Sequence, residues 1–443
     1  MRRLGTMALA AVLGLLLFTV GGIGLLRHPP DERPDVRFSP EAGVLLRPAG
    51  GGASLAGTIA SLQDRLRAVP EDWRGFAQLG LAYVQEARIT ADPGSYPKAE
   101  GVLRRSLELN GRDNFEALVG MGALALARHD FEAALAWGKR ALAENSFNGD
   151  VYGVIGDAQL ELGRYHDAFD TFQAMVDTRP GLASYARVSY ARELRGDVRG
   201  AIVAMEAALE AAGTPEDAAW ARYQLGELYF NSGRLHHAKA AYRAGVALAP
   251  DFIPPHAGLA KVAWAEGDLE RAIRGFSWVV RRFPAPEHVI ALGDLYASNG
   301  QDTLAERQYA LVRAEEDLFR ANGVNVDLEL ALFDADHGRP GDALAAARAE
   351  WGRRHSIHVA DALAWALYAN GRYEDAVRYA NRALSLGTGN ALFMFHAGMI
   401  RLRLGDGEAA RRLLRHAVAT NPSFSIRWTA FAMRTLADLE ARS

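Results

Sequence analysis

Apolar residues recur along most of the chain at the spacing of paired amphipathic helices. In one stretch, a helical face is formed by positions i, i+3, i+4 and i+7, which are Tyr152, Ile155, Gly156 and Gln159. A turn at Gly163 follows, and Ala168, Phe172 and Met175 then repeat a helical spacing on a second segment. Because this period matches the 3.6 residues of a helical turn, the pattern predicts a helix–turn–helix unit.

The helix–turn–helix pattern repeats about every 34 residues. An alanine near the start of each second helix marks the period: Ala99, Ala134, Ala168, Ala201, Ala238, Ala272, Ala305, Ala343, Ala376 and Ala410. Successive alanines are 33 to 38 residues apart, and from the second onward a Gly, Ala or Ser lies twelve residues before each. Ten units in register indicate a repeat protein in which each unit packs on the next.

The repeated sequence resembles the tetratricopeptide repeat. The family pattern W-x2-L-G-x2-Y, A-x3-F and P is matched in one unit by Arg222, Leu225, Gly226, Tyr229, Ala238, Tyr242 and Pro250. The resemblance covers about residues 73–424, although the first aromatic residue of the pattern is replaced in most units. It implies an all-α, right-handed α-solenoid of about ten helix–turn–helix units, with a concave surface that binds protein partners.

Further helical segments flank the repeats. Residues 54–69 and 424–441 are predicted to cover the apolar faces of the terminal units, so the solenoid should extend over residues 54–443. Residues 88–94 are an insertion that we expect to lengthen the turn of the first unit. The extra residues 318–325 should instead lengthen the second helix of the seventh unit.

The N-terminal residues have a different pattern. Leu4–Leu26 is a run of 23 uncharged residues, and a helix of this length spans roughly 34 Å, enough to cross a hydrocarbon core of about 30 Å. We expect residues 1–26 to be a membrane anchor or signal-anchor, with a cleaved signal peptide as the alternative. The Pro- and Gly-rich residues 27–53 are predicted to be a linker.

Composition narrows the location and the chemistry. Arginine far outnumbers lysine, a bias typical of a GC-rich bacterial genome. The signal-like position of Leu4–Leu26 then favours a single-pass protein of the bacterial cytoplasmic membrane, with most of the chain outside the cytoplasm. The absence of cysteine excludes disulfides, thiolate zinc sites and cysteine nucleophiles. A net charge of −3 argues against nucleic-acid binding.

Motifs for catalysis or cofactor binding are missing as well. No lysine lies in a phosphate-binding loop, and the adjacent His236 and His237 would point about 100° apart on a helix, unlike a metal-binding i, i+4 pair. His355 and His358 straddle a predicted turn without a carboxylate placed to complete a site. We therefore expect a protein that is not an enzyme and has no cofactor and no metal site.

A stripe of acidic and aromatic residues on the first helices is the candidate partner-binding surface. It comprises Trp220, Tyr223, Glu227, Phe230, Trp264, Lys261, Asp294, Tyr190, Glu193, Trp365 and Tyr368. Exposed aromatic side chains beside acids are typical of recognition surfaces, and they favour a protein or peptide segment with basic and apolar groups. The alternative for Phe230 and Trp264 is packing against the next hairpin.

The function expected from these features is that of a membrane-tethered, non-catalytic interaction scaffold. Two alternatives stay open. One is an accessory subunit of a machine for cell-envelope synthesis, secretion or cytochrome maturation, and the other is a structural protein that self-associates into a homo-oligomer. No residue in the sequence identifies the partner.

Overall fold

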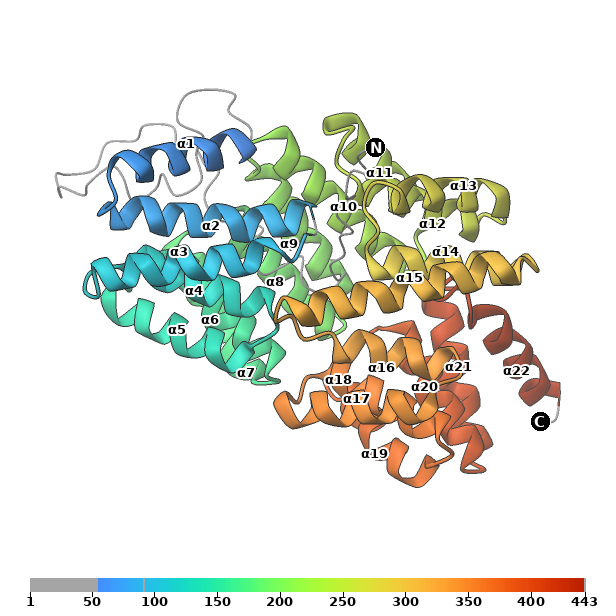
Figure 1. The fold of residues 1–443 in the computed structure, drawn as a ribbon. Coiled ribbons are helices and arrows are strands. Elements are labelled where there is room, and N and C mark those ends of the chain that lie inside the picture. Colours follow the sequence, from blue (N-terminus) through green and yellow to red (C-terminus); the bar gives the residue numbers. More distant parts are fainter. Residues whose placement is uncertain (1–54, 91, 442–443) are drawn as a thin grey trace.

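The computed structural model describes residues 55–90 and 92–441, in which all 22 regular elements are α-helices (Figure 1). Ten hairpins follow one another, and we number them as units one to ten. Their first helices are α2 (Trp73–Thr90), α4 (Phe115–Ala127), α6 (Gly149–Glu161), α8 (Leu182–Leu194), α10 (Pro215–Asn231), α12 (Pro254–Ala265), α14 (Pro286–Ser298), α16 (Asp327–Asp336), α18 (Ile357–Ala369) and α20 (Ala391–Arg403). The prediction of an all-α series of helix–turn–helix units is confirmed.

The second helices alternate with these along the chain. They are α3 (Ser95–Leu109), α5 (Phe131–Glu144), α7 (Tyr165–Thr178), α9 (Val198–Glu210), α11 (Leu235–Leu248), α13 (Leu269–Val280), α15 (Asp302–Ala321), α17 (Pro340–Arg353), α19 (Tyr373–Ala383) and α21 (Gly407–Thr420). One helix flanks the hairpins at each end, α1 (Leu55–Ala68) and α22 (Thr429–Ala441).

The predicted membrane span Leu4–Leu26 and the predicted linker 27–53 lie outside the described residues. Within those residues, none of the helices combines the length and the apolar character needed to cross a bilayer.

Capping residues define where many of the second helices begin. Asp130, Asp197, Asp268 and Asp406 each precede such a helix, and each carboxylate accepts a hydrogen bond from the backbone NH three residues later. These bonds satisfy NH groups that have no partner within the helix. The preceding turn contains a glycine with positive φ in eight units, whereas in unit two His129 takes that place with φ 60°.

Close contact between the two helices of a hairpin explains the small residues of the repeat. In unit five, the ring of Tyr242 on α11 lies against Gly226 on α10, where a Cβ atom would come within 2.3 Å of the ring. Ala238, one turn before Tyr242, is fully buried. A larger side chain at Gly226 or Ala238 would therefore push the two helices apart.

Units one and seven depart from the 34-residue length in different ways. The extra residues of unit one extend the first helix itself, so that α2 continues to Thr90 rather than ending in a longer turn as expected. Helix α15 has 20 residues, which confirms the lengthened second helix of unit seven. Near its end, Phe319 is buried in the hydrophobic core that also contains Leu103 and Leu124 of units one and two.

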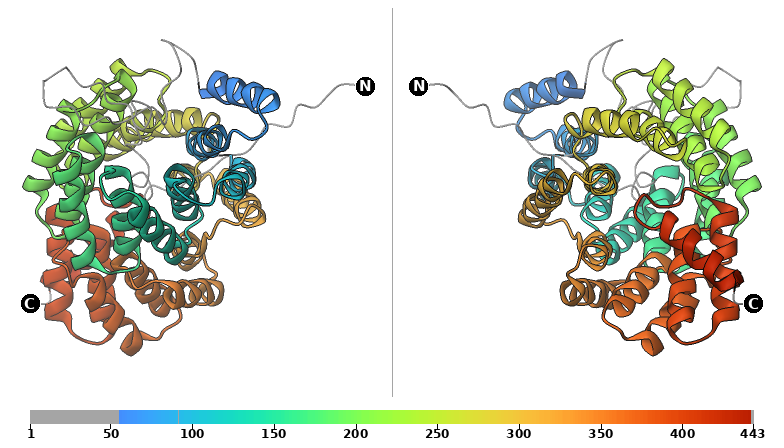
Figure 2. Two further views of the ribbon diagram at one scale, coloured as in Figure 1. Left: turned by 90° about the vertical axis from the view of Figure 1, so that its left-hand side faces the viewer. Right: turned by 90° about the vertical axis from the view of Figure 1, so that its right-hand side faces the viewer.

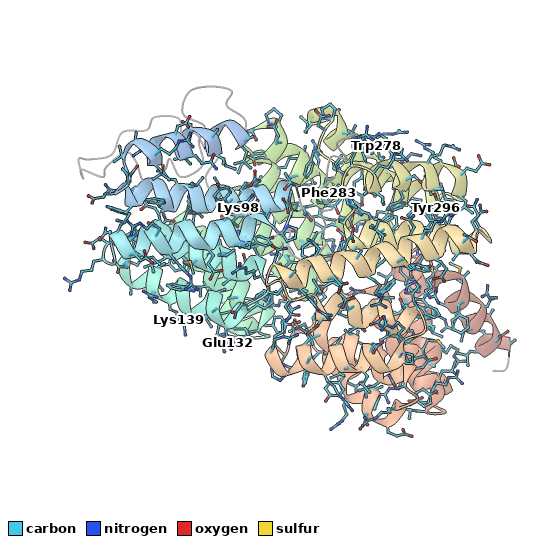
Figure 3. All side chains as sticks on the ribbon, viewed as in Figure 1. Lys98, Glu132, Lys139, Trp278, Phe283 and Tyr296 are labelled. Atoms are coloured by element: carbon cyan, nitrogen blue, oxygen red, sulfur yellow. The ribbon has the colours of Figure 1, made fainter. Side chains whose placement is uncertain are left out.

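First and second helices have different surroundings. Glu132 and Lys139 on the second helix α5 are exposed at the outer edge of the molecule (Figure 3). The first helices α4, α6 and α18 are instead buried along almost their entire length. The second helices thus form the outer surface, and the first helices line the interior.

The series of units winds back on itself, so that units three to five pack against units eight to ten (Figure 2). Each contact joins the turn within one hairpin to the end of a later hairpin or to the connection that follows it. The three pairs in contact are Gly163 with His355, Gly196 with Gly387 and Gly233 with Thr420. A Cβ atom at Gly196 would lie 2.3 Å from the carbonyl oxygen of Gly387, so this approach requires glycine.

Buried apolar and charged groups hold two successive turns of the superhelix together, the first containing units three to five and the second containing units eight to ten. One core joins units three and four to units nine and ten through Leu160, Phe172, Leu194, Ile357 and Phe393. Arg354 forms ion pairs with Glu161 of unit three and Glu350 of unit eight, and all three side chains are buried. The backbone NH of Ile357 also donates a hydrogen bond to the Tyr165 hydroxyl at 2.6 Å.

Candidate functional site

A cavity of about 520 Å³ lies inside the superhelix. Its lining from the first helices of units four to seven includes Tyr190, Glu193, Tyr223, Gln224, Glu227, Asn231, Lys261, Glu287, His288 and Ala291. Units eight to ten and the connections near them contribute Leu328, Leu332, His358, Asp361, Asn390, Phe393, Asn421 and Phe424. Asn231 is an exposed residue, so the cavity reaches the surface at the end of α10.

Five residues of the predicted stripe line this cavity. Tyr190 and Glu193 come from α8, Tyr223 and Glu227 from α10, and Lys261 from α12. These three helices belong to consecutive units, and the same spacing on each helix turns the side chains to the interior. The structure therefore brings together the central part of the stripe.

Three further residues of the stripe pack inside or between hairpins. Trp220 is buried in the core that contains Leu182 and Met205. Phe230 is buried too, and the Lys261 ammonium lies 4.4 Å from the centre of its ring. Trp264 is half-buried against the cores that join units five, six and seven.

The other three stripe residues lie away from the cavity. Trp365 is buried, stacks on Tyr368 at 4.6 Å between ring centres, and donates from its indole to Asp336 at 2.7 Å. Asp294 accepts hydrogen bonds from the Tyr309 hydroxyl at 2.9 Å and from His337 at 3.0 Å. These side chains hold units seven to ten together, a packing arrangement that spacing along one helix does not reveal.

Glu227 is a carboxylate of the cavity that is held by two other side chains. It accepts hydrogen bonds from the Lys261 ammonium at 2.6 Å and from the hydroxyl of the fully buried Tyr242 at 2.5 Å. Such charge-assisted bonds are short and strong in surroundings with little water. They fix Glu227 and Lys261 in place as a pair on the cavity wall.

Two other glutamates have strongly perturbed acidity. Burial raises the pKa of Glu193 to about 7, against a hydrogen bond from Asn231 that lowers it, and the charge of Glu227 raises it further. Burial likewise raises the pKa of Glu287 to about 8, with added repulsion from Glu329 and Glu227. Both side chains are half-buried, and they line the cavity. Near neutral pH each can therefore gain or lose a proton when its surroundings change.

The two histidines of the cavity are uncharged at neutral pH. Burial lowers the pKa of His288 to about 3, and the nearby Lys261 charge lowers it further. Burial lowers the pKa of His358 to about 3 as well, with repulsion from Arg354. The two imidazoles therefore add polar lining to the cavity but no positive charge.

Sequence reasoning missed Gln224, Glu287, His358 and Asp361 as cavity residues. Glu287 holds the same place in unit seven that Trp220 holds in unit five, so the repeat register was a signal for it. His358 and Asp361 reach the cavity from the second turn of the superhelix. Spacing within the repeats contains no signal for a contact between turns.

Carboxylates outnumber cations in the lining. The acidic residues are Glu193, Glu227, Glu287 and Asp361, and the cation is Lys261. Glu227 is paired with Lys261, and Asp361 lies 2.9 Å from His396 Nδ1. This lining suits positively charged groups.

Known protein families match segments of the same repeats. One family description, tetratricopeptide repeat, matches residues 84–149, 258–317 and 362–423, and a second of that description matches residues 221–252. The chain contains tetratricopeptide repeats. The matched repeats supply Glu227 and Lys261 to the cavity. No curated protein matches the chain.

Solved structures with a similar arrangement are also found, at low identity. The Cut9–Hcn1 hetero-tetramer of the APC/C is 15% identical over 87% of this chain and 83% of that chain, with a TM-score of 0.39. Human IFIT1, as a dimer with PPP-AAAA, is 15% identical over 74% and 77%, with a TM-score of 0.47. Yeast Tom70 is 13% identical over 88% and 86%, with a TM-score of 0.33.

Proposed function

We propose that this protein is a non-catalytic interaction scaffold that binds a short segment of a partner protein in the cavity. Tetratricopeptide repeats generally bind proteins or peptides, and the repeats of this chain form the cavity wall. The observation that carries the proposal is the cavity itself, in which aromatic and acidic side chains from consecutive repeats line one space. Such a mixture of apolar walls and few polar groups is typical of binding sites.

The size of the cavity limits what can bind. Units three to five pack against units eight to ten, and the cavity is lined by units four to ten rather than by the whole series. A volume of about 520 Å³ lies in the range of sites for drug-sized ligands. The bound segment would therefore be a few residues long, with basic groups to complement the carboxylates.

We further propose that Leu4–Leu26 tethers the scaffold to the bacterial cytoplasmic membrane, with the repeats on the outer side. The support is the uncharged length of this run, which suffices to span a bilayer. A tethered scaffold with a small internal site would suit an accessory subunit of an envelope, secretion or cytochrome-maturation machine.

Filling the cavity tests the proposed function. Ala291 lines the cavity on α14, and Ala291→Trp would occupy the space without removing any charge. A photo-crosslinking amino acid at Tyr223 should label a defined partner in native membranes, and Ala291→Trp should abolish that labelling. Ala240→Trp, at an exposed position on the second helix α11, is the matched control.

The crosslinking result has two readings. Loss of the adduct with Ala291→Trp but not with Ala240→Trp, at unchanged melting temperature, supports binding in the cavity. An adduct that survives Ala291→Trp, or that forms equally from the exposed Arg271 on α13, contradicts it.

A further inference from the structure

Two carboxylates of the cavity have no basic side chain paired with them among the residues that the structure describes. Glu193 lies near the end of α8, and Glu287 lies near the start of α14. Glu227 is close enough to both for its charge to raise the pKa of each, but Glu227 itself is paired with Lys261. The cavity therefore offers two separate places for positive charge, with a neutralised pair between them.

A second observation concerns Gln224, which lies on the same wall next to Tyr223. Its side chain is only 7% exposed, it lines the cavity, and its Nε2 has no hydrogen-bond partner in the described part of the chain. A buried donor without an acceptor costs free energy, and a ligand that supplies an acceptor removes that cost. A ligand that complements the cavity should therefore carry a hydrogen-bond acceptor as well as positive charge.

The rest of the lining suits a peptide. The rings of Tyr190, Tyr223, Phe276, Phe393 and Phe424 provide aromatic surface. Guanidinium groups and aliphatic stems pack well on such rings. The volume of the cavity is also in the range of a drug-sized ligand, roughly the size of two or three residues.

We propose that the cavity binds a dibasic peptide segment: one cationic side chain pairs with Glu193, the other pairs with Glu287, and a backbone carbonyl accepts a hydrogen bond from Gln224 Nε2. This inference rests on the proposed function, because it names the chemistry of the segment bound in the same cavity. A free polyamine offers the same two charges but has no carbonyl group. The unpaired amide of Gln224 therefore favours a peptide over a polyamine.

Binding should be linked to proton release. Burial raises the pKa of Glu193 to about 7 and that of Glu287 to about 8, so both are at least partly protonated at pH 7. The groups that act on Glu193 are Asn231 and Glu227, and those that act on Glu287 are its own backbone, Glu329 and Glu227, none of them cationic. Two incoming positive charges would favour the ionised carboxylates and displace protons into solution.

Isothermal titration calorimetry on the full-length protein tests the inference. The ligand is the capped dipeptide acetyl-Arg-Arg-methylamide, and its neutral analogues carry citrulline in place of one or both arginines. We expect each replacement to weaken binding about tenfold or more, because a charge-assisted hydrogen bond is lost. Titration in buffers of different ionisation enthalpy should show protons released on binding. Equal affinity for the arginine and citrulline peptides would overturn the inference without the need for any variant.

Protein variants test whether Glu193 and Glu287 each pair with one arginine of the dipeptide. Glu193→Gln and Glu287→Gln should each weaken the dipeptide about tenfold, and either variant should bind the dibasic and monobasic peptides almost equally. Neither should lower the melting temperature, because glutamine resembles the protonated carboxyl group. Glu270→Gln, at an exposed glutamate on α13, should leave binding unchanged. Unchanged affinity in both cavity variants would overturn the inference.

Gln224→Leu distinguishes a dibasic peptide from a free polyamine as the ligand. It should weaken the dipeptide and leave the weaker binding of spermidine unchanged, whereas tighter binding of spermidine than of the dipeptide would overturn the peptide assignment. Failure of this inference can be told from failure of the proposed function. A crosslinked partner that is lost with Ala291→Trp, combined with no affinity for the dipeptide, would refute only the dibasic assignment.

Discussion

At the scale of single residues, several ionisable side chains lie buried in the interior of this protein. Some are compensated, as Asp157 is by two hydrogen bonds from Arg187 at 2.9 and 2.7 Å. Others are not. Glu315 on α15 is fully buried, and neither of its carboxylate oxygens has a hydrogen-bond partner in the described residues. A group of this kind is tolerated in a fold only in its neutral form.

Glu315 should make stability depend on pH. Burial, with added repulsion from Glu287, raises its pKa to about 9, whereas an unfolded chain has the ordinary value near 4.3. Between these values the folded state holds a proton that the unfolded state has lost, so folding stability falls as pH rises, by up to about 1.4 kcal/mol per pH unit. Glu315→Gln lacks this proton and should be more stable than the wild type at pH 8, with little difference near pH 4. Thermal melts across this range check the prediction, and parallel curves for the two proteins would contradict it.

At the scale of helices and turns, the same glycine turn serves two purposes in different units. In every such turn, positive φ ends the first helix of the hairpin. In units three to five, the glycine turn of the hairpin also touches residues at or just after the ends of units eight to ten. The turn glycine of unit nine, Gly371, has no neighbour within 4 Å of the place where a Cβ would stand.

Alanine substitution should separate these two purposes. Gly163 and Gly371 have φ of +78° and +73°, so Gly→Ala at either position should cost about 1 kcal/mol for the backbone conformation. At Gly163 the new Cβ would also lie 2.5 Å from the carbonyl oxygen of His355, which should cost roughly 1–3 kcal/mol more. Chemical denaturation of the two variants measures the difference. Equal losses of stability in the two variants would mean that the contact of Gly163 with His355 can adjust to the new Cβ without a cost in free energy.

At the scale of the whole molecule, contacts between turns change how the solenoid holds together. In an open solenoid each repeat touches only its neighbours, so stability is nearly a sum of local terms. Here Arg354 connects unit eight to Glu161 of unit three, across 193 residues of sequence. Units far apart in sequence should therefore unfold together.

Arg354→Met tests this coupling. The change leaves the buried Glu161 without its cation and leaves Glu350 with Arg353 alone, which should cost roughly 3–5 kcal/mol. Hydrogen exchange should accelerate in α6 and α17 alike. Arg348→Met, at an exposed position of the same helix α17, should neither lower the stability nor accelerate exchange in α6 and α17. Faster exchange confined to α17 and its immediate neighbours would contradict coupling between the turns.

The proposed membrane anchor is tested on the whole protein as well. If Leu4–Leu26 inserts as a helix, the protein should stay with membranes after salt and carbonate washing. A reporter that is active only after export, fused after Ser443, should be active. Recovery of a soluble form that begins near residue 25, or activity of a cytoplasm-only reporter, would contradict the anchor or its orientation.

Much of the fold was determined by the sequence alone, because the repeat is local. The spacing of alanines such as Ala238 and the glycine turns depend on contacts within one hairpin, and those contacts recur every 34 residues or so. The hairpins and the long helix α15 could therefore be predicted. The continuation of α2 to Thr90 could not, because an insertion can lengthen either a helix or a turn.

The site was determined only in part. Spacing on each first helix placed Tyr223 and Glu227 on the inner face, and the structure has them in the cavity. Only the tertiary structure decided that units four to ten line one cavity, that Trp365 is buried by neighbouring rings, and that Asp361 reaches the cavity from a distant unit. The physical reason is that the closure of a superhelix depends on small rotations summed over many units. No single repeat contains that sum, whereas each repeat contains the pattern of its own hairpin.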